Sequence, residues 1–101
     1  MNSSTYVFSH RAVLENAPKA SGVYSIFNSK RWVHVGESDD IQQSLFNLLN
    51  EPSPCLRRFS PLSFSFAPAP PAERAARLKS MIDARHPACT LELTNRRTYE
   101  G

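Results

Sequence analysis

The chain has 101 residues, of which 41% are hydrophobic and 21% charged, a composition typical of one soluble globular domain spanning residues 1–101. No apolar run approaches the roughly 20 residues of a membrane span, and the opening MNSSTYVFSHR lacks the basic start and apolar block of a secretory signal, so we expect a cytoplasmic protein with no membrane partner. The formal net charge of +3 permits a nucleic-acid partner without requiring one, because the basic residues are scattered in runs of at most two.

The N-terminal part predicts an extended segment followed by a helix. Tyr6–Phe8 is expected as a short strand or an extended arm, and residues 1–9 can pair with an exposed edge strand, which would be a route to homodimers or to a protein partner. Ser9 is suited to cap a helix over HRAVLENA, and Pro18 ends that helix.

A β-hairpin and a second helix follow. Residues 23–27 and 32–35 are rich in β-branched and aromatic side chains and flank the turn NSKR, which predicts two antiparallel strands. Ser38 is expected to cap the next helix, with Asp39 and Asp40 in its first turn, where the helix dipole favours carboxylates. The spacing of four apolar residues predicts one buried stripe on that helix, formed by Ile41, Leu45, Leu48 and Leu49.

The second half predicts a loop, a strand and a third helix. Residues 52–61 are expected to be a loop, and the alternation of Leu62, Phe64 and Phe66 with serines predicts a half-buried strand. Pro71 fits the first turn of a helix that ends at His86-Pro87, with a stripe of Ala75, Leu78 and Ile82. CTLELT is a candidate last strand before a polar tail over 95–101. We therefore predict an α+β fold with a small mixed, mainly antiparallel, three- to four-stranded sheet flanked by helices.

The two cysteines, Cys55 and Cys89, form no CxxC pair and lie near no histidine cluster with metal-ligand spacing. In a reducing cytoplasm we expect two free, part-buried thiols in preference to a disulfide.

GVY at 22–24 and HVG at 34–36, followed by the polar helix start ESDDI, resemble the paired motifs of the GIY-YIG nuclease domain. The later strand SFSF and the helix end MIDARHP resemble the closing part of the same family, so the resemblance is strongest over residues 18–90. It implies a small sheet flanked by helices, and an activity that hydrolyses phosphodiester bonds with one divalent metal ion.

The resemblance also assigns roles to individual positions. Tyr24 matches the first tyrosine of the motif, whose phenolic oxygen would orient or deprotonate the attacking water. His34 stands where a second tyrosine is usual; its imidazole can still exchange a proton, and the alternative is an ordinary strand histidine with one satisfied ring nitrogen. Gly36 matches the last glycine and is expected to allow a close approach of its neighbour.

Two further catalytic positions of the family carry unsuitable residues. Ser44 occupies the position of the arginine that would neutralise charge on the phosphate, and Leu78 that of the metal-binding carboxylate. Glu73 and Asp83 lie too far around the same helix to replace it. The resemblance therefore predicts no metal site, and Mg²⁺ is needed only if the protein is an active nuclease.

The basic residues are the candidates for a nucleic-acid contact. They either converge on a groove or form an ordinary solvated surface, and the selected set is Lys30, Arg31, Arg57, Arg58, Arg74 and Arg77. In the opposite sense, the three acids beside the motif, Glu37, Asp39 and Asp40, would repel a phosphate backbone.

Three functional hypotheses remain open. The first is a catalytically impaired GIY-YIG-like domain that binds DNA or RNA, with Tyr24 and His34 as vestiges. The second is an active metal-dependent endonuclease that holds its metal unconventionally, for example through Glu37. The third is a protein-interaction scaffold with no nucleic-acid role.

Overall fold

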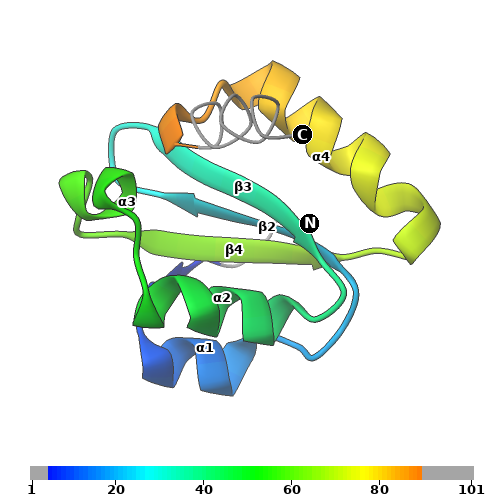
Figure 1. Cartoon of the computed structure of the whole chain (residues 1–101), viewed down its shortest axis with the longest axis horizontal. Coiled ribbons are helices and arrows are strands. Elements are labelled where there is room, and N and C mark those ends of the chain that lie inside the picture. Colours follow the sequence, from blue (N-terminus) through cyan, green and yellow to red (C-terminus); the bar gives the residue numbers. More distant parts are fainter. Residues whose placement is uncertain (1–4, 90–101) are drawn as a thin grey trace.

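The computed structural model describes residues 5–89 of the chain (Figure 1). The expected last strand beyond Cys89 and the polar tail over 95–101 lie outside the described residues. In chain order the elements are β1 (Tyr6–Val7), α1 (His10–Asn16), β2 (Gly22–Phe27), β3 (Trp32–Ser38), α2 (Ile41–Asn50), α3 (Pro54–Arg58), β4 (Ser63–Pro68) and α4 (Pro71–Arg85). No helix within this range is long and apolar enough to cross a membrane.

The four strands form one sheet in the order β1-β4-β2-β3, and each neighbouring pair is antiparallel. The predicted α+β class and the hairpin of β2 and β3 are therefore confirmed. β1 pairs with β4 of its own chain, with Tyr6 opposite Phe64. The described part of this segment is thus an edge strand of its own sheet, and pairing of that edge with another copy stays a prediction.

The two faces of the sheet are covered by different helices. Figure 1 shows α1 and α2 on one side of the sheet and α4 on the other. Because side chains alternate along a strand, Ile26 and its cross-strand neighbour Phe64 point to the same face. Both are fully buried there with Val13 of α1 and Leu45 of α2. The main core thus lies between the sheet and the first two helices.

The helix starts are set by local side chains. Ser9 accepts a hydrogen bond from the Ala12 N–H, as expected for the cap of α1. For α2 the prediction was wrong by two residues: Asp40 is the cap and accepts from the Gln43 N–H at 3.0 Å. Ser38 instead ends β3, and its hydroxyl accepts from the Asp40 N–H. Such serine and aspartate bonds compete over a few residues, so spacing alone does not select the cap.

Two other local predictions need correction. The segment expected to be a loop contains the short helix α3, which begins with Pro54 in its first turn and is capped by Ser53. In α4, Ala75 is exposed, and the half-buried side of the helix carries Arg74, Leu78 and Ile82. The half-buried side of α4 therefore includes Arg74 in place of the predicted Ala75.

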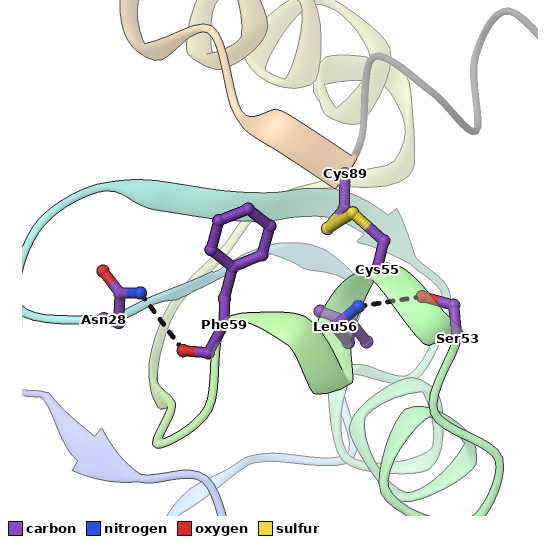
Figure 2. Close-up of a disulfide and its surroundings, with 6 residues drawn as sticks. All are labelled: Asn28, Ser53, Cys55, Leu56, Phe59 and Cys89. Atoms are coloured by element: carbon purple, nitrogen blue, oxygen red, sulfur yellow. Dashed lines mark hydrogen bonds between the residues drawn. A yellow bond between two sulfur atoms is a disulfide. The ribbon is translucent and has the colours of Figure 1, made fainter.

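Cys55 and Cys89 are joined in a disulfide, with their Cα atoms 5.8 Å apart (Figure 2). The expectation of free thiols, which assumed a reducing compartment, is therefore wrong. The bond connects α3 to the chain just after α4, and both cysteines are buried in the main core. Close by, the Asn28 side chain donates a hydrogen bond to the Phe59 carbonyl at 3.1 Å, which joins the β2–β3 turn to the end of α3.

Candidate functional site

Tyr24 and Gly36 lie directly opposite each other in the β2–β3 register. A Cβ atom at Gly36 would lie 2.5 Å from the Tyr24 hydroxyl oxygen and 2.6 Å from Cζ. Gly36 is therefore required because the tyrosine ring passes over it, as the sequence predicted. The Tyr24 and His34 rings are neighbours, with centroids 5.8 Å apart, and each residue is only 7% exposed.

Burial also decides the charge of His34. Desolvation lowers its pKa from 6.5 to about 4, so the imidazole is neutral at pH 7. A neutral ring keeps one donor and one acceptor nitrogen. His34 is thus a buried, uncharged strand residue beside Tyr24.

The two positions with unsuitable residues are both occupied by ordinary structural contacts. The Ser44 and Ser38 hydroxyls share a hydrogen bond of 2.5 Å, which joins the second turn of α2 to the end of β3. Leu78 is half-buried on α4, the helix that packs on β3 and β2. Neither side chain can supply a guanidinium or a metal-binding carboxylate.

The donor set was tested against the divalent metal ion that the resemblance implies. Mg²⁺ prefers oxygen ligands and is usually held by one or two carboxylates. Across residues 5–89, no group of three or more His, Cys, Asp or Glu side chains could hold a metal ion. With leucine at the expected ligand position, the site offers no carboxylate where the resemblance places the metal.

Arg74 neutralises two of the acids beside the motif. Its Nε lies 3.4 Å from a carboxylate oxygen of Glu37, and its Nη1 donates to Asp39. The Nε contact lacks hydrogen-bond geometry, so it is a charge–charge contact. The Arg74 side chain is only 17% exposed. The Arg74 guanidinium is therefore paired with acids, and Glu37, the unconventional metal ligand of the second hypothesis, already faces a cation.

A groove of about 960 Å³ lies on the α4 side of the sheet. The helix packs on β3 and β2 and leaves the adjoining part of that face as the floor, which includes Val23, Ser25, Ser65 and Ala67. Four cations line it, two from the β2–β3 turn and two from α4: Lys30, Arg31, Arg77 and Arg85. No aspartate or glutamate is among its described lining residues, although the whole chain carries 12 basic and 9 acidic residues.

The structure thus divides the predicted cations into two sets. Lys30, Arg31 and Arg77 converge on the groove, while Arg74 does not line it. Arg57 and Arg58 are exposed on α3 and also lie outside it. Arg77 additionally forms an exposed ion pair with Glu73, one turn before it, at 3.3 Å.

The groove also contains an aromatic cluster that the sequence analysis did not select. The Trp32 and Phe27 rings have centroids 4.8 Å apart, and the Arg85 guanidinium lies 4.0 Å from the centroid of the indole. The available signal was a tryptophan directly after Lys30-Arg31, at the start of the return strand. Trp32 and Arg85 are 53 residues apart in the sequence, so no local pattern indicates their contact.

Comparison with known proteins gives a likeness in structure alone. No family model matches the chain, and no curated protein matches it. The GIY-YIG N-terminal endonuclease domain of UvrC from Thermotoga maritima, bound to magnesium as its catalytic divalent cation, superposes with a TM-score of 0.63 at 18% identity, over 77% of this chain and 90% of that one. A point mutant of the same domain, bound to its catalytic divalent cation, gives 0.63 at 18% identity over 78% and 91%. The chain therefore has the fold of a GIY-YIG endonuclease domain, as its two motifs predicted.

Proposed function

We propose that this protein is a GIY-YIG-like domain that binds nucleic acid and has lost the capacity to cleave it. The observation that carries the proposal is the groove between α4 and the sheet, whose described lining holds four cations and no acid. A protein of net charge +3 whose groove is lined by positive side chains and by no described acid is suited to a polyanion.

The loss of cleavage is argued from the chemistry of the four family positions. Phosphodiester hydrolysis needs a cation beside the phosphate and a carboxylate on the metal. Ser44 and Leu78 supply neither. The remaining pair, Tyr24 and His34, is largely buried, and neither a phenol nor a neutral imidazole replaces the missing cation or carboxylate. The UvrC domain binds magnesium, but its metal does not identify any metal ligand in this chain.

Binding is argued from the location of the cations. Lys30 and Arg31 extend from the β2–β3 turn, while Arg77 and Arg85 lie on α4 on the other side of the concavity. Charges on two sides of a groove can contact successive phosphates of one backbone. Of the acids that would repel such a backbone, Glu37 and Asp39 are paired with Arg74, while Glu73 forms an exposed ion pair with Arg77.

Anisotropy titrations with labelled oligonucleotides over a salt series test the binding. Four phosphate contacts give a slope of log K against log salt of about −3, or roughly fifty-fold weaker binding when the salt concentration rises fourfold. The double variant Lys30→Gln/Arg77→Gln should bind weakly and halve the slope. Lys79→Gln, a matched loss of one cation from α4 outside the groove, should change little. Absent binding at low salt would refute the nucleic-acid role and favour the protein-scaffold alternative.

A metal-supplemented cleavage assay on plasmid and branched DNA tests the lost activity. We expect no cutting above the blank. Cutting that requires Mg²⁺ and disappears in Tyr24→Phe would refute the proposal and establish the alternative of an active endonuclease.

A further inference from the structure

We infer that the groove accepts a single strand with unstacked bases in preference to a duplex. The inference rests on the proposed nucleic-acid role and deepens it. Its basis is the difference between the rim of the groove, which is cationic, and the floor, which is apolar, aromatic and hydroxylic.

The floor is suited to bases and poorly suited to phosphates. It is formed by alternate residues of β2 and β4, with Val23 next to Ala67 and Ser25 next to Ser65 in the register; the β4 residues are half-buried and supply most of its accessible surface, whereas Val23 and Ser25 are buried beneath. The two serine hydroxyls share a hydrogen bond of 2.7 Å, and each hydroxyl has the capacity for a further bond. Apolar surface with a few hydroxyls matches the faces and edges of a nucleobase and offers no positive charge to a phosphate.

At the turn end of the groove, Trp32 and Arg85 form a preassembled stacking platform. The guanidinium lies 4.0 Å from the centre of the indole, and Phe27 supports the same ring at 4.8 Å. A planar guanidinium on an indole is a surface on which a base can stack, and stacking of this kind tolerates any base. Trp32 is half-buried, which leaves part of the ring accessible from the groove.

A duplex cannot use these features. Its base faces are covered by their neighbours in the stack, so a duplex offers the groove only phosphates and sugars. It would contact the rim through residues such as Lys30 and Arg77 and leave the floor and the platform empty. A single strand satisfies both, because its phosphates can lie along the rim while its bases turn toward the floor.

The experiment uses the fluorescence of Trp32, the only tryptophan in the chain. The chain of 101 residues is titrated with single-stranded DNA, single-stranded RNA and the matched duplex, each of the same length, and the binding is also followed by anisotropy of the labelled strand. We expect both single strands to change the Trp32 emission and to bind at least tenfold more tightly than the duplex. The comparison of the DNA and RNA strands shows which sugar is preferred.

Variants separate stacking from charge. Trp32→Leu should weaken binding of the single strand about tenfold while leaving the salt slope unchanged, since base stacking contributes affinity without counterion release. Arg77→Gln should lower the slope by about 0.7, and the control Lys79→Gln should do neither. Circular dichroism and thermal unfolding of each variant confirm that it is folded before it is compared.

The outcomes distinguish the inference from the proposed function. Duplex binding that equals or exceeds single-strand binding overturns the inference and leaves the nucleic-acid role standing. The same holds if a single strand binds without altering Trp32 emission and Trp32→Leu binds as well as the natural chain. Absence of binding to all three probes at low salt overturns both.

Discussion

Removal of the disulfide between Cys55 and Cys89 should cost a large share of the stability of the domain. The bond closes a loop with a sequence separation of 34 residues. For a loop of that length, the loss of unfolded-state entropy corresponds to about 4 kcal/mol at room temperature. Domains of this size are typically stable by about 5–15 kcal/mol, so the double variant Cys55→Ala/Cys89→Ala should remain folded with a much smaller margin.

Urea denaturation followed by circular dichroism measures this loss. The oxidised chain, the chain reduced with dithiothreitol and the double alanine variant are compared at one protein concentration. With a slope of about 2 kcal/mol per molar urea, a loss of about 4 kcal/mol lowers the midpoint by roughly 2 M. Reductant should lower the midpoint of the natural chain and leave that of the double variant unchanged.

Two results would refute this reasoning. The first is an equal midpoint for the oxidised and reduced chains when thiol titration shows that the bond is formed in one and absent in the other. The second is a titration that finds two free thiols in the folded protein under non-reducing conditions, since the cysteines would then be unpaired despite their proximity.

Three further perturbations test other parts of the structure. Gly36→Ala should destabilise the fold by about 1–3 kcal/mol, because its Cβ would lie 2.5 Å from the Tyr24 hydroxyl oxygen. Adding Tyr24→Val should restore part of this loss, as measured by thermal unfolding. An unchanged unfolding midpoint for Gly36→Ala alone would contradict the close contact. The pKa of His34 is about 4 in the folded protein and 6.5 in the unfolded chain, so the unfolded chain binds the proton more readily. The free energy of unfolding is therefore highest above pH 6.5 and decreases as the pH falls, by about 2 kcal/mol at pH 5. His34→Gln should flatten this part of the stability profile, whereas the exposed control His10→Gln should retain it. Arg74→Gln should cost about 1 kcal/mol at low salt and less at high salt, measured by urea denaturation, and a loss independent of salt would refute the ion-pair account.

The secondary structure was largely predictable because its signals are local. Alternation in SFSF, the turn residues of NSKR and the spacing of Ile41 and Leu45 each depend on a few neighbouring residues, and the corresponding elements are present. Errors occurred where two local signals compete. Ser38 and Asp40 are both good caps, and only the course of β3 beyond Val35 determines that the helix begins after Asp40.

The candidate site was predictable only in part. Tyr24, His34 and Gly36 could be located because they lie within one hairpin, whose register follows from its turn. Arg74 was placed among the candidates for a nucleic-acid contact because its spacing allows it to share a side of the helix with Arg77. Its carboxylate partners lie 35 and 37 residues earlier in the chain, and no pattern in α4 indicates them.

The hairpin, the GIY-YIG-like order of elements and the lack of a guanidinium at Ser44 and of a carboxylate at Leu78 follow from the sequence alone, because the identity of a side chain sets which bonds it can make. Only the tertiary structure decided which cations share a groove and which cysteines are joined. Lys30 and Arg85, like Cys55 and Cys89, are brought together when α4 packs across the sheet and the chain after it returns to α3. That packing depends on the surfaces of whole elements, which the spacing of residues along one segment does not describe.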